Sequence, residues 1–410
     1  MKTKLYAFQE RGVEFHLRHR YSLNLCEMGL GKTIQALAVA EKVGGRVVIL
    51  CPAFLQENWR AEIRKHVEGP LDCEIIPYSR LSTDTFNVKK CKILIADEIH
   101  YLKNPDANRT KAALDIVKSL KPDYFIGLTG TPIKNRVPEF YTLLSLVSMN
   151  PRPTSGIDLN KYFRNKDHFA ARYCYLEQFS VGSIKVKKWH GFNMDRLEEF
   201  KELLQGKVFK VKSEDALELP PMIHKRVQTN IEPISTLEKE FEAFLAGGKN
   251  IMAKKSSATL KAKATAEYVQ DILDQGDGPV VVFTDHVDSA KLISRHFKLM
   301  PITGETPIHE RSVLTDKFNG GDIPVLIATI GSFSVGVNLT AARHLVFNDI
   351  SWVPGDNFQA MKRIHRIGQT KPCVIHYMLA GHVDEYILDT LQQKMAVIDT
   401  TNSLALGVSA

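Results

Sequence analysis

Residues Tyr21–Val43 read YSLNLCEMGLGKTIQALAVAEKV and join a short apolar run, a glycine-containing turn and a long run with helical spacing. We expect YSLNL to form a strand and IQALAVAEKV to form a helix, with EMGLGKT as the loop between them. A strand, a tight loop and a helix in this order are the unit from which parallel α/β sheets are built. This stretch therefore predicts an α/β fold.

The loop carries the groups that a bound phosphate needs. Backbone amides at the helix start can hold a β-phosphate, the Lys32 ammonium can neutralise phosphate charge, and the Thr33 hydroxyl can bind magnesium. Cys26 stands where the general phosphate-loop pattern has glycine. The strand, loop and helix context nevertheless favours nucleotide binding over a chance turn. The predicted nucleotide-binding residues of this loop are Met28, Gly29, Leu30, Gly31, Lys32, Thr33 and Ile34.

The same alternation of strand-like and helix-like runs recurs along the chain, which predicts parallel sheets covered by helices. Each run of the first half ends where a polar or glycine-rich motif begins. Because parallel strands end at one edge of a sheet, we expect these motifs to lie together there. The expected strands are YSLNL, RVVILC, KILIAD and YFIGLTG in the first half, and PVVVFT, IPVLIAT, RHLVFND and CVIHYML in the second.

Two of these strand ends carry candidate catalytic groups. KILIAD delivers Asp97 and Glu98, and we expect Asp97 to hold magnesium through water and Glu98 to orient and deprotonate an attacking water. Leu128–Pro132, LTGTP, ends the next strand with small hydroxylated residues that suit sensing of a nucleotide. Together with the phosphate loop they predict the acidic half of a phosphoryl-transfer site.

At 410 residues the chain is longer than one hydrophobic core usually supports, so two domains are expected. The alternation fades after about Asn150, and Leu217–Pro221, LELPP, cannot continue a helix. We expect a first α/β domain at 1–150, a helical protrusion and crossing at 151–221, a second protrusion at 222–278 and a second α/β domain at 279–410. The basic clusters Lys185–Lys188 and Ala253–Lys255 fall in these protrusions, and the carboxyl-terminal VDEYILDTLQQKMAVI predicts a bracing helix.

Composition narrows the class of protein. A net charge of +8 and a pI near 9.0 allow a polyanionic partner. Six cysteines without CxxC spacing argue against zinc and against a disulfide framework, so reduced, mostly buried thiols are expected. No apolar run is long enough for a bilayer, and the first residues lack the apolar core of a secretory signal. We expect an intracellular protein of the cytoplasm or nucleoid, or of the nucleus in a eukaryote, with no membrane partner.

Gln359–Gln369 reads QAMKRIHRIGQ and places Arg363 and Arg366 three residues apart, on one face of a predicted helix. Two guanidinium groups on one face can grip a phosphate.

These motifs together resemble the Swi/Snf group of superfamily 2 helicase-like ATPases, and the resemblance covers nearly the whole chain. YAFQERG resembles the adenine-recognising segment with Gln9 reading the base, EMGLGKT motif I, CPAFLQENWRAE motif Ia, and DEIH motif II with Lys103 and Asn104 as its tail. LTGTPIKN resembles motif III, VVFTDHVDSA motif IV, SVGVNLTAA motif V, and NDISWVPGDNFQAMKRIHRIGQT motif VI. In motif V, Phe333 and Ser334 stand where the family has a glycine pair.

The resemblance implies two tandem RecA-like lobes, each a mainly parallel sheet flanked by helices, with helical protrusions between them. It implies ATP and magnesium as cofactors, with Lys32, Asp97, Glu98, Arg363 and Arg366 as catalytic residues. The residues implied to couple ATP to movement are His100, Thr129, Gly130, Gly336 and Gln359. The residues implied to contact DNA phosphates are Lys103, Asn104, Asn135, Arg136, Thr329 and Ser332.

The function expected from this resemblance is an ATP-dependent double-stranded DNA translocase that acts as a monomer, with a targeting protein as a further partner. If both arginines belong to the second lobe, hydrolysis would wait for closure of the cleft. A strand-separating helicase and an ATP-gated DNA clamp with little turnover are the alternatives. The motifs are shared with the helicase, and the altered motif V leaves room for the clamp.

Overall fold

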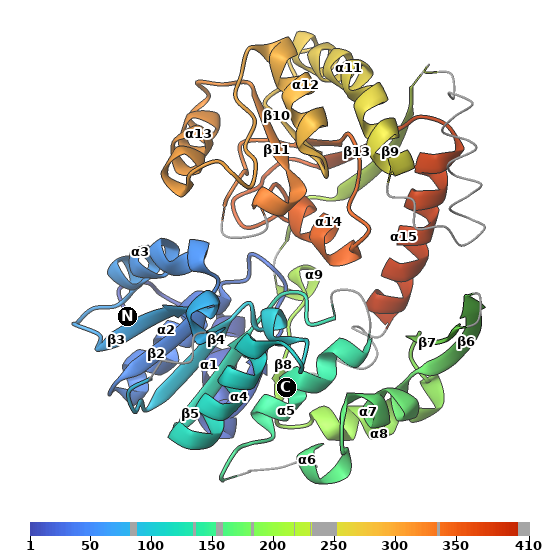
Figure 1. Ribbon diagram of the computed structural model, residues 1–410. Coiled ribbons are helices and arrows are strands. Elements are labelled where there is room, and N and C mark those ends of the chain that lie inside the picture. Colours follow the sequence, from blue (N-terminus) through green and yellow to red (C-terminus); the bar gives the residue numbers. More distant parts are fainter. Residues whose placement is uncertain are drawn as a thin grey trace. The chain divides into compact units, whose positions relative to one another are not determined.

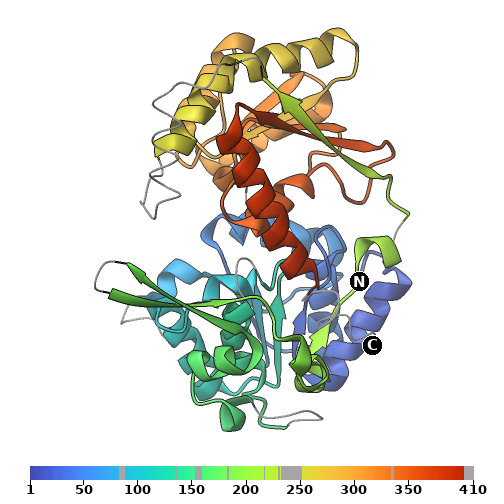
Figure 2. The ribbon, with the colours of Figure 1, turned by 90° about the vertical axis from the view of Figure 1, so that its right-hand side faces the viewer.

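The computed structural model describes residues 1–82, 88–133, 137–152, 159–181, 184–216, 218–229, 231, 252–333 and 337–400. The chain divides into two compact units. Unit 1 comprises Met1–Leu217 and Ala396–Ala410, and unit 2 comprises Glu218–Met395. Each unit is built on a large sheet with parallel ladders and flanking helices (Figures 1 and 2). The predicted α/β class with mainly parallel sheets is confirmed.

The unit 1 sheet has the strand order β3-β2-β4-β5-β1-β8, and every described pairing within it is parallel. Parallel neighbours share a direction, so β1, β4 and β5 all end at the same edge. Its strands are β1 (Tyr21–Asn24), β2 (Val47–Cys51), β3 (Cys73–Pro77), β4 (Ile93–Asp97), β5 (Tyr124–Leu128) and β8 (Val208–Phe209).

Helices and short 3-10 turns connect these strands in unit 1. The strands β1 and β2 are buried at every position, as expected for a sheet that is covered on both faces. The helices are α1 (Ala7–His19), α2 (Lys32–Val43), α3 (Gln56–His66), α4 (Asn108–Leu120), α5 (Phe140–Val147), α6 (Leu159–Tyr162), α7 (Lys166–Tyr173), α8 (Leu197–Leu204) and α9 (Ser213–Ala216).

The segment after α5 was predicted to be a helical protrusion, but it is only partly helical. It contains the antiparallel hairpin β6 (Tyr175–Val181) and β7 (Ile184–His190), and the basic cluster Lys185–Lys188 lies on β7. The two strands of a hairpin pair with each other rather than within a buried sheet. A hairpin can therefore form without a continuous run of apolar residues. The helical part of this segment comprises a 3-10 turn, η5 (Met194–Arg196), followed by α8. The segment then returns to the unit 1 sheet through β8.

Unit 2 has the strand order β11-β10-β12-β13-β9, again with parallel ladders throughout. The edge strand β9 lies in a segment that was predicted to be helical. Its elements are β9 (Met222–Gln228), α11 (Met252–Asp274), β10 (Val280–Thr284), α12 (Val287–Phe297), α13 (Ile308–Gly320), β11 (Val325–Thr329), η6 (Ile330–Phe333), β12 (His344–Phe347), α14 (Pro354–Met361), β13 (Cys373–Leu379) and α15 (His382–Thr400) as far as Met395.

Two apolar clusters pack on the two faces of the unit 2 sheet. Val280 and Val282 of β10 pack with α11 and α12, whereas Val281 and Phe283 pack in a cluster with residues of α13, α14 and α15. Alternate strand residues point to opposite faces, so the continuous apolar run VVVF serves both clusters. Figures 1 and 2 show α11 and α12 lying side by side against this sheet.

All six cysteines lie among the described residues. All six cysteines are free thiols, five of them buried, and Cys73 is half-buried. Among the described helices, none is long and apolar enough to cross a membrane.

A buried ion pair holds α11 to the carboxyl end of β13 in unit 2. Lys261 is 1% exposed, and its ammonium lies 2.7 Å from Asp384 Oδ2 and donates to the Met378 carbonyl at 2.9 Å. The same Asp384 oxygen accepts from the Ser257 hydroxyl and from the Ala380 backbone amide. Removal of one member would leave the other charge buried and unpaired.

We therefore expect Lys261→Met to destabilise unit 2 by about 3–5 kcal/mol. Hydrogen exchange at the amides of β13 measures the loss within this unit. Lys263→Met on the same helix is the control, because the Lys263 side chain is 87% exposed and its removal should leave exchange unchanged. Equal protection in the two variants would contradict the role of the ion pair.

Candidate functional site

The predicted phosphate loop joins the end of β1 to the start of α2. Gly29 and Gly31 have φ angles of 83° and 70°, which side chains rarely allow. A Cβ at Gly31 would lie 2.5 Å from Gln9 Nε2, so space as well as conformation requires glycine there. The tight loop leaves the first amides of α2 at the edge of the sheet, as anion binding at a helix start requires.

Lys32 begins α2 and folds its side chain back over the loop. Its ammonium donates to the backbone carbonyls of Cys26 at 2.9 Å and Glu27 at 3.2 Å. Neutral carbonyls are weaker partners for an ammonium than charged phosphate oxygens are. The side chain is therefore held in the loop in a position from which it can transfer to a phosphate. Thr33 and Ile34 follow in the first turn of α2, with Thr33 partly exposed and Ile34 buried.

Buried amides fix the shape of this loop from behind. Asn24 donates to Gln35 Oε1 at 2.9 Å, and its own side-chain oxygen accepts from the Cys26 amide at 3.2 Å. Gln35 and Gln9 both donate to the Leu30 carbonyl, at 3.4 and 3.2 Å. From the sequence, Gln35 was assigned to motif I without a role, and Asn24 was not singled out. The sequence signal for these two residues was an amide side chain within an apolar strand and another within an apolar helix face. In the structure both amide residues are 0% exposed, so each must find hydrogen-bond partners inside the fold.

Gln9 was expected to read a base, and the structure gives it a role in the loop. It is 4% exposed; its Oε1 accepts from the Tyr6 amide at 3.0 Å while its Nε2 holds Leu30. The amide thus links the start of α1 to the phosphate loop. Oε1 and Nε2 of Gln9 can each form one further hydrogen bond, so recognition of a base by Gln9 stays a prediction.

Glu27 ties the loop to the last segment of unit 1. Its Oε2 accepts from the Ser213 hydroxyl at 2.7 Å and from the Ser213 amide at 3.3 Å, and its own amide donates to Val211. Ser213 is the first residue of α9, shortly before the chain passes into unit 2. The sequence pattern did not reveal this contact between residues 186 positions apart.

The acidic pair follows β4, as predicted. Asp97 is the last strand residue, and its Oδ1 accepts from the Glu98 amide while its Oδ2 accepts from Trp59 Nε1, both at 2.8 Å. Burial and the neighbouring Glu98 charge raise the pKa of Asp97 to about 7, against the lowering effects of these donors and of the Lys32 charge. The Lys32 charge acts on Asp97, so the fold has brought the loop and the acidic pair together.

Glu98 has a left-handed backbone, with φ 47° and ψ 49°, and the residue is only 7% exposed. A residue other than glycine keeps this conformation only where the surroundings enforce it, and such residues cluster at functional sites. The Thr129 hydroxyl at the end of β5 donates to Glu98 Oε2 at 3.3 Å and accepts from the Thr131 amide. The carboxylate is thereby held between two strand ends.

His100 completes this arrangement. Its Nδ1 lies 3.1 Å from Glu98 Oε2 and 3.0 Å from Thr129 Oγ1. Both of these oxygens accept here, so Nδ1 carries the proton. Its Nε2 is buried and has no hydrogen-bond partner among the described residues. The predicted coupling residues His100 and Thr129 are therefore brought together on Glu98.

Gly130 brings the end of β5 against the phosphate loop. A Cβ at this position would lie 2.7 Å from the Met28 side chain and 3.2 Å from both the Met28 amide and Lys32 Nζ. Three strand ends of unit 1 thus meet at one edge of the sheet, as their parallel order requires.

The residues predicted to contact DNA from unit 1 have partners within the unit. Lys103 forms an ion pair with Glu139 at 2.9 Å, and the Asn104 side-chain oxygen accepts from the Asp106 amide at 3.2 Å. Asn135 and Arg136 lie outside the described residues. The structure thus describes one cation of this predicted set, and its charge is paired.

In unit 2 the predicted DNA residues lie at the end of β11. Thr329 is 6% exposed, and the Ser332 hydroxyl lies 2.7 Å from the Thr329 carbonyl and 3.0 Å from the Ile302 carbonyl. Arg311 of α13 supports the same segment by donating to the carbonyl of Ser332 at 2.9 Å. The predicted coupling residue Gly336 lies outside the described residues.

The prediction that Arg363 and Arg366 share a helical face is wrong. α14 ends at Met361, and both arginines lie in the turns that follow. The backbone carbonyl of Arg363 accepts from the Leu339 amide at 3.0 Å, so it is used outside any helix. Both guanidinium groups nevertheless point to one place, because each donates to the Val337 carbonyl, at 3.5 and 3.2 Å.

Residues around the arginines are also buried. Gln359 on α14 is 1% exposed, and Gln369 donates to three backbone carbonyls of unit 2, those of Thr340, Ala342 and Ile364. Gln369 also accepts from the amides of residues 370 and 371. The amide of Gln369 therefore fastens the turn that carries Arg366 to the segment after Val337.

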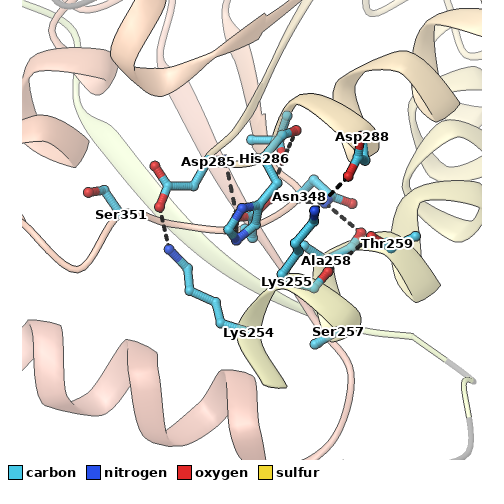
Figure 3. Close-up of polar contacts among 12 residues, drawn as sticks. Lys254, Lys255, Ser257, Ala258, Thr259, Asp285, His286, Asp288, Asn348 and Ser351 are labelled. Atoms are coloured by element: carbon cyan, nitrogen blue, oxygen red, sulfur yellow. Dashed lines mark hydrogen bonds and ion pairs between the residues drawn. The ribbon is translucent and has the colours of Figure 1, made fainter. Parts of the chain in front are cut away.

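A second polar cluster in unit 2 comprises Asp285, His286 and Asp349, whose ligand atoms lie close enough to hold a metal ion. Figure 3 shows Lys254 of α11 reaching Asp285, while Lys255 reaches Asp288. Asp349 accepts from the Thr284 hydroxyl and the Asp285 amide. The cationic position at Asp285 is thus taken by a lysine, and the cluster attaches α11 to the ends of β10 and β12.

Family models match both halves of the chain. Residues 71–166, in unit 1, match the SNF2-related domain, and residues 263–368, in unit 2, match the helicase conserved C-terminal domain. The two matches follow in the order that the motifs predict.

Similar proteins span nearly all of the chain. The DNA annealing helicase and endonuclease ZRANB3 of Mus musculus is 29% identical over 98% of this chain and 41% of its own length. The SWI/SNF-related matrix-associated actin-dependent regulator of chromatin subfamily A-like protein 1 of Xenopus laevis is 29% identical over 96% of the chain and 44% of its length. The chain thus spans less than half of either relative.

Among solved structures, the Sulfolobus solfataricus SWI2/SNF2 ATPase core in complex with dsDNA is 23% identical, covers 100% of this chain and 96% of its own, and has a TM-score of 0.42. The two family models, one in each unit, and the relatives that align along almost the whole chain agree with the motif set. The matched models and relatives support an SNF2-type, helicase-like family for this chain.

Proposed function

We propose that the chain is a DNA-dependent ATPase that moves along double-stranded DNA and remodels DNA structures or protein–DNA complexes. The observation that carries this proposal is the meeting of Lys32, Asp97 and Glu98 at one edge of the unit 1 sheet, with Glu98 held by Thr129. Similarity to this family supports nucleotide use. A relative named as a DNA annealing helicase supports DNA as the polymer, which would place the protein inside the cell.

The nucleotide would bind over the loop between β1 and α2. Lys32 would exchange its two backbone carbonyls for β- and γ-phosphate oxygens, and the amides of Met28–Ile34 would surround the β-phosphate. Gln9 would contact the base.

The residues present fit magnesium as well. Thr33 and Asp97 offer only oxygen ligands, which is the set that this ion prefers. When bound, magnesium would neutralise charge that develops on the phosphates. Thr33 and Asp97 would hold it.

Glu98 would act as the general base. Its carboxylate is oriented by Thr129 and by His100 Nδ1, and a positioned carboxylate can align and deprotonate an attacking water. Thr129, which His100 also contacts, connects the base to the residues that follow β5. His100, Thr129 and Gly130 are therefore proposed to transmit the state of the nucleotide, together with Gln359 and Gly336 of unit 2.

Arg363 and Arg366 are proposed to stabilise charge on the γ-phosphate during transfer. Their shared partner, the Val337 carbonyl, is neutral and holds both groups together in unit 2. An arginine that reaches the phosphate only at the moment of transfer makes hydrolysis depend on domain motion. This dependence would turn hydrolysis into movement.

DNA would be held through its phosphates, because a moving protein needs contacts that are independent of sequence. The net charge of +8 is compatible with this partner. The proposed contacts are Lys103, Asn104, Asn135, Arg136, Thr329 and Ser332, of which Lys103 would have to leave Glu139.

Nucleic-acid specificity gives the first test. Duplex DNA should raise the ATPase rate above the rate without nucleic acid, and the stimulation should fall steeply with salt because phosphate contacts release counterions. Rates with single-stranded DNA and with RNA are the controls. Stimulation by RNA alone would refute the proposal. Displacement of a triplex strand without unwinding of a tailed duplex identifies a translocase, and unwinding of the tailed duplex identifies a strand-separating helicase.

Glu98→Gln tests the base. Glutamine keeps an oxygen that can accept from Thr129 but cannot take a proton, so turnover should fall by about 10²–10⁴. ATP binding, measured by fluorescence of a labelled nucleotide, should persist. Glu57→Gln, an exposed carboxylate on α3 of the same unit, is the control and should keep wild-type turnover. Unchanged ATP-driven function in Glu98→Gln would favour an ATP-gated clamp.

Arg366→Ala tests the contribution of unit 2. The loss of a guanidinium group that stabilises transferred charge should lower turnover by about 10³–10⁵ while ATP binding to unit 1 is kept. Arg295→Ala, an exposed arginine of α12, provides the matched charge change. Single-turnover hydrolysis at saturating ATP separates an effect on the hydrolysis step from an effect on ATP binding. Equal rates for Arg366→Ala and Arg295→Ala would exclude this role.

A further inference from the structure

Trp59 is the largest side chain in the described part of the protein that is fully buried. It lies on α3, in the segment that follows β2, and 0% of it is exposed. An indole has one polar atom, and a buried indole N–H requires an acceptor. That acceptor is Asp97 Oδ2, at 2.8 Å. If Trp59 served only as an apolar anchor of α3, its N–H would not be needed. The hydrogen bond joins α3 to the end of β4, between residues that are 38 positions apart in the chain.

The Trp59 contact completes the restraint on the Asp97 carboxylate. One carboxylate oxygen accepts from the Glu98 amide and the other accepts from the indole, so rotation of the group would break at least one hydrogen bond. Each carboxylate oxygen has two lone-pair directions, so one direction on each is left for another partner. The two donors therefore fix the plane of the carboxylate without using up its capacity to bind.

Tyr78 provides a comparison at the same residue. Its side chain is 2% exposed, and its hydroxyl donates to the main-chain carbonyl of Asp97 at 2.7 Å. Tyr78 thus holds the backbone at the end of β4, whereas Trp59 holds the carboxylate. The two buried aromatic residues each make one hydrogen bond to Asp97, and only one of these bonds bears on the group that would receive a metal ion.

We propose that Trp59 is a positioning residue that orients the Asp97 carboxylate toward the magnesium that accompanies the nucleotide. The inference rests on the proposed ATPase function, because that function gives Asp97 its partner. Donors behind a metal-binding carboxylate hold it in the geometry that the ion needs, and their loss typically weakens metal affinity by about 10- to 100-fold.

Trp59→Phe removes the N–H and keeps an aromatic ring. Binding of Mn²⁺ to the protein with ADP, followed by electron paramagnetic resonance, reports on the metal without any turnover. We expect the Mn²⁺ dissociation constant of this variant to rise about 10-fold or more. Binding of labelled ADP in EDTA should stay at the wild-type level, because the phosphate loop is unchanged. In turnover, the Mg²⁺ concentration for half-maximal rate should rise in parallel.

Tyr78→Phe is the matched control. It also removes one hydrogen bond from Asp97, so a general loosening of this region would affect both variants alike. We expect its Mn²⁺ affinity to stay close to that of the wild type. Site-specific replacement of Trp59 by benzothienylalanine keeps the shape of the indole and removes only the donor, which covers the case in which Trp59→Phe does not fold.

The outcomes separate this inference from the proposed function. If the wild type binds no nucleotide, or hydrolyses no ATP with either Mn²⁺ or Mg²⁺ present, the ATPase proposal itself fails. If the wild type shows metal-dependent binding and the variants that lack the indole N–H match Tyr78→Phe, the ATPase proposal stands and the role of Trp59 is refuted.

Discussion

The parallel pairing of β4 and β5, and of β5 with β1, is the constraint on which the candidate site depends. Parallel strands must end at one edge, so the residues that follow them meet although they are far apart in the chain. Asn24, Asp97 and Leu128 are neighbours in this register. Glu98, His100 and Thr129 lie within a few residues of these ends, and the phosphate loop begins shortly after Asn24.

Buried polar contacts then convert proximity into defined geometry. An apolar edge would bring the loop and the acidic pair together without setting the direction of any side chain. Asn24 and Gln35 shape the phosphate loop, and Thr129 with His100 orients Glu98. In a low dielectric each such group must be satisfied, so few alternative arrangements are allowed. Polar contacts also set side-chain directions in unit 2, where Arg363 and Arg366 both donate to the Val337 carbonyl.

Most strands and the phosphate loop were predictable because their signals are local. Buried parallel strands need continuous apolar runs, and the tight loop needs glycine where φ is positive, as at Gly31. The missed elements lack such signals. β3 is an edge strand with only two buried residues, β8 has two residues, and β9 is an exposed edge strand. β6 and β7 pair only with each other. The arginine turn was misread as a helix because its backbone bonds to Leu339, which no spacing rule reveals.

The sequence by itself determined the α/β class, the two-part organisation, the order of the motifs and the residue types of the candidate site. These follow from hydrophobic periodicity and from glycine, lysine and carboxylate chemistry, all of which are encoded within short windows. Only the tertiary structure decided which side chains touch. Trp59 meets Asp97 and Glu27 meets Ser213 because separate elements pack at one sheet edge. Contacts at such separations depend on the whole packing, since no short segment contains both partners.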